Sequence, residues 1–257
     1  MSGTGFAGSS TITITYDGTA QTTSPATITT SPTGAFSATF TVPSSAIGSH
    51  TVQATDGTNS PTATFTVTPV FTQPTITTKS VVAASTSLQY SVTQANSFVV
   101  IVVTSGDYQL TSAPTWPSGF TQQEGISYSN QYSDYIAVNT AQAINTYTVS
   151  CQAPSSSTGI SIAVYVFAPG TYSYVHNSLS SSGSSTSETL TLTAGANYYI
   201  FGGSIGSGTI SLSTTTIDVK DSSNWSAIGH QTTNAATVSS TSSSYVGIVG
   251  ISITRTG

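Results

Sequence analysis

The chain has few side chains that could carry acid–base or nucleophilic chemistry, and these are widely spaced. Its 257 residues include three histidines and eight carboxylates. A Ser–His–acid site needs a histidine that is held by a carboxylate and faces a serine. His176 and His230 are the candidates, with Asp218 and Asp221 near His230, whereas His50 begins an expected strand and is interpreted as structural. No G-x-S-x-G or H-E-x-x-H motif accompanies them, so we expect no enzyme.

Paired carboxylates and metal-binding motifs are also missing from the sequence. A glycosidase needs two acids in defined settings, and no carboxylate here lies in one. Asp218 and Asp221 flank Lys220 in the densest charged cluster, which is interpreted as a solvated surface; a loop Ca²⁺ site using either acid is the alternative. We expect no catalytic residue, no metal and no cofactor. The carboxylates considered are Asp107, Glu124, Asp134, Glu188, Asp218 and Asp221.

Aromatic side chains are the most suggestive candidates for binding. Tyr128, Tyr132 and Tyr135 surround a Ser-Asn-Gln turn, and Trp116 lies in a Pro/Gly loop. Carbohydrate-binding modules use exposed aromatic faces beside hydrogen-bonding amides and carboxylates. The sequence therefore predicts Trp116, Tyr128, Tyr132 and Tyr135 as glycan-binding residues; the alternative is that these rings pack in the core or along strand edges.

Two further side chains are candidates for covalent modification or reaction, Asn224 and Cys151. Asn224 begins the sequence Asn-Trp-Ser, an N-x-S sequon, and is a candidate glycosylation site. Cys151 is the single cysteine and shares a strand face with Tyr147 and Val149. This position favours a small buried hydrophobic residue rather than a reactive thiol.

Charge is unusually scarce, and its scarcity limits the partners of the protein. Only 4% of residues are charged, the net charge is -5, and three basic residues are present. So few cations cannot neutralise a nucleic-acid backbone or form a polybasic membrane patch, so we expect no nucleic acid and no direct membrane insertion. A Ser/Thr-rich surface with few titratable groups is typical of an extracellular protein. The first residues lack a basic and an apolar region, so we expect this chain to carry no signal peptide.

The expected elements are all strands. The apolar run 98–103, Phe-Val-Val-Ile-Val-Val, is β-branched after Phe98 and apolar on both faces, so it predicts a strand covered on both sides near the middle of a sandwich. No helical periodicity persists for three turns. We predict an all-β protein with two domains, at 1–69 and 75–257, joined by a linker at 70–74.

Residues 3 to 69 resemble the Ig-like repeats of archaeal and bacterial cell-surface proteins. Four motifs carry the likeness: the GxGF opening at 3–6, the YDG hairpin at 16–18, the GxFSATFTVP strand at 34–43 and the GSHTVxATD strand at 48–56. The resemblance implies an Ig-like sandwich that serves as a spacer or stalk.

Residues 75–257 resemble the jelly-roll-like β-sandwich domains of surface proteins and viral appendages. The segments that carry this likeness are 96–103, 116–120, 135–138 and 160–167. The region also contains an internal echo. Ser85-Thr-Ser and Ser185-Thr-Ser each precede an apolar strand, and Thr148-Val-Ser matches Thr237-Val-Ser, which favours a jelly-roll-like sandwich with two similar halves.

The sequence thus predicts an extracellular, all-β structural or adhesive protein of the cell surface. Its Ig-like spacer would carry a larger jelly-roll-like sandwich, and copies would self-associate through open sheet edges into a pilus-like filament, stalk or layer, or bind other surface proteins. The alternative is a carbohydrate-binding adhesin module on an Ig-like spacer.

Overall fold

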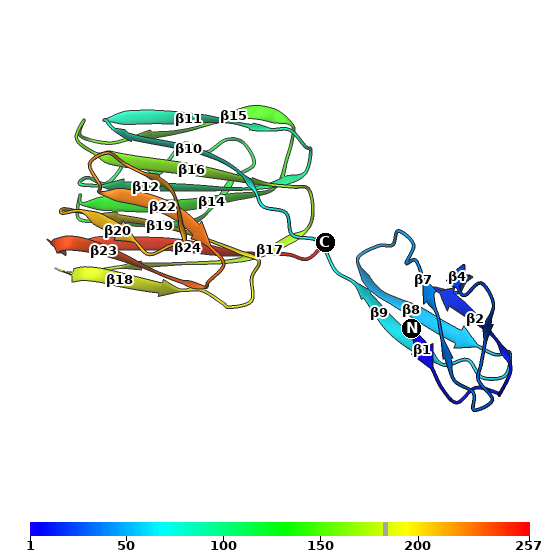
Figure 1. Ribbon diagram of the computed structural model, residues 1–257. Helices are drawn as coiled ribbons and strands as arrows, with labels where there is room; N and C mark the ends of the chain where they lie inside the picture. The colour runs from blue at the N-terminus through cyan, green and yellow to red at the C-terminus, as the bar shows by residue number, and fades with distance from the viewer. Residues whose placement is uncertain (182–184) are drawn as a thin grey trace. The chain divides into compact units, whose positions relative to one another are not determined.

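The computed structural model describes residues 1–181 and 185–257, apart from the side chain of residue 243. These residues divide into two compact units, Met1–Pro69 and Val70–Gly257 (Figure 1). The described residues form strands and no helix. The predicted all-β class with sandwich architecture is therefore confirmed.

The N-terminal unit is a small sandwich of short strands. Its main sheet has the order β3-β2-β8-β9, with β5 also paired to β2, and two-stranded sheets β1-β6 and β4-β7 complete it. The strands are β1 (Ser2–Gly3), β2 (Thr11–Tyr16), β3 (Thr19–Ala20), β4 (Thr23–Ser24), β5 (Ile28–Thr29), β6 (Phe36–Ser37), β7 (Thr39–Phe40), β8 (Gly48–Thr55) and β9 (Thr62–Val67).

The core of this unit follows from strict alternation along its strands. Ile12, Ile14 and Tyr16 of β2 are buried while the intervening threonines face outward. Phe6 and Phe36 pack edge to face across the same core, with ring centroids 5.4 Å apart. The expected hairpin after Tyr16 is present, because Asp17 and Gly18 both adopt positive φ between β2 and β3.

The larger unit contains two sandwiches built in the same way. Half 1 comprises β10 (Thr75–Val82), β11 (Ser85–Val92), β12 (Ser97–Gly106), β13 (Thr121–Tyr128), β14 (Tyr132–Gln142), β15 (Asn145–Gln152) and β16 (Gly159–Phe167). Half 2 comprises β17 (Tyr172–Ser180), β18 (Ser185–Thr191), β19 (Tyr198–Ile205), β20 (Ile210–Leu212), β21 (Thr216–Lys220), β22 (Ser226–Gln231), β23 (Ala235–Ser244) and β24 (Val246–Arg255).

The strand order is equivalent in the two halves. The five-stranded sheets run β10-β16-β12-β14-β13 and β17-β24-β19-β22-β21, and the outer sheets run β11-β15 and β18-β23-β20. In each half the first strand lies beside the last, and the second pairs with the one before the last. The strand β20 is peculiar to half 2; at its place in half 1 a single bridge joins Thr115 to Ser150.

The equivalence extends to single residues. A β-bulge interrupts β13 between Gln122 and Glu124, opposite the middle of β14. The corresponding strand of half 2, β21, is interrupted between Ile217 and Val219, at the matching place opposite β22. Because bulges are specific features of a fold, a shared bulge shows that the sequence echo reflects a structural repeat.

The two halves pack through their five-stranded sheets and place β12 at the centre. All ten residues of β12 are buried. Phe98, Val100 and Val102 pack against half 2, whereas Val99 and Ile101 pack beneath the outer sheet β11-β15. Figure 1 shows the resulting layers, with β11 and β15 at one side of the larger unit and β18 and β23 at the other. The prediction that this strand is covered on both faces is confirmed.

The first residues of the larger unit lie in the expected linker, 70–74. Phe71 packs its ring on Phe167 and on Tyr198, with centroids 6.0 and 5.9 Å away. Arg255 donates a hydrogen bond to the carbonyl of Val70. This part of the expected linker is therefore attached to the larger unit.

One carboxyl group is completely buried between the halves. Asp134 has no exposed surface, and its Oδ1 accepts a hydrogen bond of 2.6 Å from Ser204 of half 2. Its Oδ2 has no hydrogen-bond partner among the described residues. Burial raises the pKa of Asp134 to about 8, against the opposing effect of the Ser204 hydroxyl. The carboxyl group is therefore neutral at pH 7.

We predict that the larger unit loses stability as the pH rises through this range. The folded state retains a proton that the unfolded state, with an ordinary Asp pKa of 3.8, has released. Stability is therefore greatest below pH 4 and falls up to about pH 8, by on the order of 5 kcal/mol. Asp134→Asn should abolish most of this dependence. Denaturant unfolding followed by tryptophan fluorescence measures it, because Trp116 and Trp225 both lie in the larger unit.

The control for this experiment is Asp56→Asn in the N-terminal unit. Backbone amides, that of Ala7 foremost, lower the pKa of Asp56, so its loss leaves the alkaline dependence of the larger unit unchanged. An Asp134→Asn protein with the same loss of stability between pH 5 and pH 9 as the wild type would contradict the prediction.

Candidate functional site

The four aromatic residues predicted to bind glycans do not form one surface. Trp116 and Tyr135 are partly buried against the core between β12 and the outer sheet of half 1. Tyr128 stacks on Tyr245, with ring centroids 4.7 Å apart. Tyr132 is fully buried, and its hydroxyl donates to the carbonyl of Val246. The expectation of an exposed Tyr132 ring is wrong, because half 2 covers it.

Trp116 and Tyr135 border the same polar side chain. The indole Nε1 of Trp116 donates to Oε1 of Gln122 at 3.3 Å. The Gln122 amide and the Tyr135 ring both lie beside Gly125. Two rings flanking an amide at the β13 edge therefore remain available as a sugar-binding arrangement.

Asn224 lies in the turn between β21 and β22, with φ of 62° and a partly exposed side chain. The hydroxyl of Ser226, which completes the sequon, is buried and bonded to Asp221 and to Ser161. Glycosylation of Asn224 stays a prediction.

Each of the three histidines lies beside a carboxylate. His176 Nδ1 is 2.7 Å from Glu124 of half 1, and His230 Nδ1 is 2.8 Å from Asp218. Asp218 also accepts a hydrogen bond from Tyr165. His230 lines a small cavity of about 170 Å³ with Thr215 and Thr216 among its neighbours.

A Ser–His–acid site requires a histidine between a carboxylate and a hydroxyl group. His176 and His230 each have the carboxylate. Among the described residues, no serine or threonine hydroxyl is hydrogen-bonded to Nε2 of His176 or His230. The described residues also contain no group of three His, Cys, Asp or Glu side chains placed to hold a metal ion.

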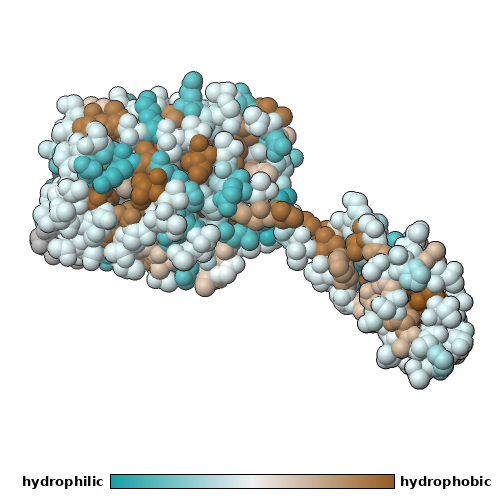
Figure 2. Space-filling model, in the orientation of Figure 1, coloured by the Kyte–Doolittle hydropathy of each residue, from teal (hydrophilic) through white to brown (hydrophobic). Residues whose placement is uncertain are grey.

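Sheet edges differ in whether a charged side chain guards them. Charges on an edge strand oppose pairing with another chain. Five edge strands carry a charged residue or a loop bridge, whereas β9, β11, β17 and β20 contain no Lys, Arg, Asp or Glu. Lys79 of β10 nevertheless donates a hydrogen bond to the carbonyl of Ser87 on β11. The edge strands that carry a charge are β10 with Lys79, β13 with Glu124, β18 with Glu188 and β21 with Asp218 and Lys220, and β15 has its bridge from Thr115. The carboxylates of Glu124 and Asp218 are bonded to His176 and His230. Figure 2 shows the accompanying surface, largely of intermediate hydropathy with few strongly hydrophilic residues.

The strand β9, Thr-Ala-Thr-Phe-Thr-Val, is the least protected of these edges. No residue of β9 is buried, and Phe65 is 40% exposed although its ring contacts Tyr16. Ala63, Phe65 and Val67 alternate with threonines along β9. They lie at the open margin of the unit, because no strand among the described residues covers them.

Hydrogen bonding defines which groups of β9 are free. The amide of Ala54 donates to the carbonyl of Pro61, so hydrogen-bonded pairs between β8 and β9 fall at every second residue from there. Ala63, Phe65 and Val67 therefore bond to β8. The backbone N–H and C=O groups of Thr62, Thr64 and Thr66 point to the free edge.

An apolar groove of about 220 Å³ lies beside this edge. Its walls come from β1 and from the start of β9, and its apolar lining is Phe6, Phe36, Val52, Ala54, Pro61 and Ala63. A free strand edge beside an apolar groove can bond the backbone of an added strand and bury its side chains.

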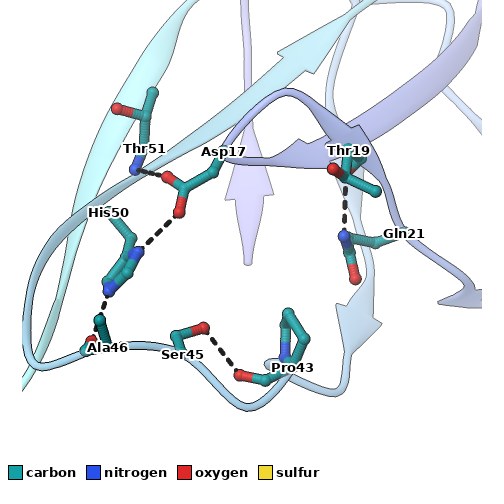
Figure 3. A network of polar contacts seen from close by, with 8 residues as sticks. All are labelled: Asp17, Thr19, Gln21, Pro43, Ser45, Ala46, His50 and Thr51. Atoms are coloured by element: carbon teal, nitrogen blue, oxygen red, sulfur yellow. Dashed lines mark hydrogen bonds and ion pairs between the residues drawn. The ribbon is translucent and has the colours of Figure 1, made fainter.

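A histidine clasp fixes the loop before β8 in the same unit (Figure 3). His50 Nδ1 lies 2.6 Å from Oδ2 of Asp17, and Nε2 lies 2.7 Å from the carbonyl of Ala46. Asp17 also accepts a hydrogen bond of 2.8 Å from the amide of Thr51. The imidazole stacks on the Tyr16 ring, with centroids 5.1 Å apart. Since both ring nitrogens face acceptors, the clasp is complete only when His50 is protonated.

The pKa values of His50 and Asp17 define the pH range in which the clasp stabilises the N-terminal unit. The Asp17 carboxylate, and then the Ala46 carbonyl, raise the pKa of His50 above 6.5. The His50 ring, and then the Thr51 amide, lower the pKa of Asp17 below 3.8. The stabilisation from His50 is therefore complete below pH 6.5 and lost as the pH rises through its raised pKa. That from Asp17 is lost only as the pH falls through its lowered pKa.

The comparisons with known proteins return no relative. No protein-family model, curated protein or solved structure matches this chain. Within residues 1–181 and 185–257, no helix has the length and apolarity needed to cross a membrane.

We predict that His50 titrates above pH 6.5 and that Asp17→Asn lowers its pKa toward that value, because the mutation removes the carboxylate. Two-dimensional NMR of the imidazole signals measures both, with the His50 resonance assigned from a His50→Gln spectrum. Asp56→Asn, which changes an acid that makes no contact with His50, should leave the titration unchanged. An identical His50 pKa in the wild type and Asp17→Asn would contradict the clasp.

Proposed function

We propose that this protein is a structural or adhesive component of an extracellular surface assembly, and that its copies associate by adding a strand to the free edge of β9. The observation that carries the proposal is the edge itself. It is uncharged, has no buried residue and is free to bond at Thr62, Thr64 and Thr66.

Composition supports an assembly role in a second way. A chain with 4% charged residues has little electrostatic repulsion to keep copies apart. Proteins that must stay monomeric place charges, prolines or bulges on their edges, and β9 has none of these.

Symmetry determines how such an assembly grows. Two β9 strands that pair antiparallel give a closed dimer, because the contact is the same on both sides. Growth into a filament or layer needs a second contact. The edge of β17, which has no Lys, Arg, Asp or Glu, supplies it, and on this strand the side chains of Val175 and Leu179 are 50% and 39% exposed.

We predict that Thr64→Pro weakens self-association about tenfold or more. Proline removes an N–H that points to the free edge and leaves the ladder with β8 intact, as edge-strand prolines do. The control is Thr64→Val, which keeps the N–H and the β-branched shape. Analytical ultracentrifugation gives the association constant, and negative-stain electron microscopy over a range of concentration and pH shows the form of the assembly.

Two results would contradict the proposal. One is a wild-type protein that stays monomeric at high concentration across pH. The other is a folded Thr64→Pro protein that associates as strongly as Thr64→Val.

Carbohydrate binding is the second candidate, and the arrangement of Trp116, Gln122 and Tyr135 favours it. We predict that Trp116→Ala abolishes glycan-array binding, because a half-buried ring beside an amide supplies both stacking and a hydrogen bond. Tyr90→Phe, a change within the outer core of half 1, is the control. An array without any bound glycan for the wild type would remove this candidate.

A further inference from the structure

The contact between the two halves includes equivalent positions at which the two halves carry different side chains. In half 1, Asp134 pairs with Thr104 of β12; in half 2, Ser226 pairs with Ser204 of β19. Asp134 and Ser226 are therefore equivalent. By the same registers, Ser161 of β16 is equivalent to Gly247 of β24, since each lies opposite Thr104 or Ser204.

The equivalent contacts across the interface have different chemistry. Ser226 of half 2 meets Ser161 of half 1, with hydroxyl oxygens 2.8 Å apart. At the mirrored place, Asp134 of half 1 meets Gly247 of half 2. One contact is a pair of small hydroxyls and the other is a buried acid against a glycine.

Gly247 is also covered by the Tyr132 ring. A Cβ at Gly247 would lie 2.8 Å from Oδ2 of Asp134 and closer still to the ring of Tyr132. Both side chains are completely buried, and the Tyr132 hydroxyl is held by the carbonyl of Val246 at 3.1 Å. Neither side chain has solvent to move into, so a side chain at this position cannot be accommodated without strain.

This arrangement distinguishes the two halves as partners. If half 1 paired with a second copy of half 1, Tyr132 and Asp134 would meet Ser161, whose Cβ and hydroxyl lie where only glycine fits. Pairing with half 2 avoids the conflict. The distinguishing feature is a projection on half 1, formed by Tyr132 and Asp134, that fits a recess on half 2 at Gly247.

We propose that this projection and recess make the interface selective, so that the sheet face of half 1 accepts half 2 of its own chain and excludes another half 1. Two similar sandwiches with large apolar faces could otherwise pair like with like between chains. The selectivity closes these faces within one chain. Association between copies is then left to sheet edges, although the proposal does not depend on β9.

The test uses the full chain and two single-methyl additions on the same strand. Gly247→Ala places its methyl against half 1. Gly250→Ala is the matched control, because its Cβ would meet Phe201 at 2.8 Å and Leu190 at 3.0 Å, both in half 2 and on the opposite face of the sheet. All variants carry Thr64→Pro, so that association through β9 is weakened equally in each.

We expect Gly247→Ala to separate the halves and Gly250→Ala to leave them closed. Small-angle X-ray scattering should show a larger radius of gyration for Gly247→Ala. Sedimentation should show a concentration-dependent dimer, since half 2 with a small residue at 247 still fits a second half 2, where Ser226 meets it. Tyr132→Leu in the Gly247→Ala background removes the ring, which is the nearer of the two obstructing side chains, and leaves space into which the Asp134 carboxyl group can turn. This double variant should therefore be a compact monomer again.

The outcomes decide the proposal even if Gly247→Ala does not fold. A double variant that folds as a compact monomer while Gly247→Ala is open or unfolded supports it. A Gly247→Ala protein that stays as compact and monomeric as Gly250→Ala overturns it. So does a double variant that behaves as Gly247→Ala does.

Discussion

The larger unit is organised by the need to cover β12 on both faces. A run of large apolar side chains on alternate sides of one strand cannot lie against water on either side. The outer sheet β11-β15 covers Val99, Ile101 and Val103, and half 2 covers Phe98, Val100 and Val102. The equivalent strand β19 is in the same position, between half 1 and the outer sheet β18-β23-β20. Each half therefore supplies the cover that the other lacks.

Because the two halves repeat the same arrangement, the larger unit is nearly symmetric. Equivalent positions that carry different residues in the two halves break this symmetry. Asp134 and Gly247 replace what in the mirrored contact are Ser226 and Ser161. A buried carboxyl group costs stability once it ionises, so the presence of Asp134 between the two halves calls for a role. Selection of the correct partner half is such a role, and a neutral acid fulfils it best at low pH.

At the surface, the scarcity of charge determines which sheet edges are open to pairing. Where a strand edge carries one of the few charged residues, as Lys79 does on β10, that edge is guarded. The edges that lack one, β9 foremost, are open to pairing. The function proposed for the N-terminal unit thus follows from the distribution of a small number of charges rather than from a constellation of reactive groups.

The sequence by itself determined the class of the fold, the central position of residues 98–103 and the burial of Cys151, which is 3% exposed. These follow from local alternation and from apolar runs, which depend only on neighbouring residues. The internal echo was also visible, in Ser85 and Ser185 at the start of β11 and β18. Tertiary structure decided the rest. The sequence could not reveal that half 2 buries Tyr132, or that β9 has no covering strand, because alternation defines two faces of a strand without saying what lies on either. The pairs Asp17–His50 and Glu124–His176 likewise join segments far apart in the chain. Pairing of β2 with β8 in one sheet brings the first pair together, and packing of one sheet on another brings the second together.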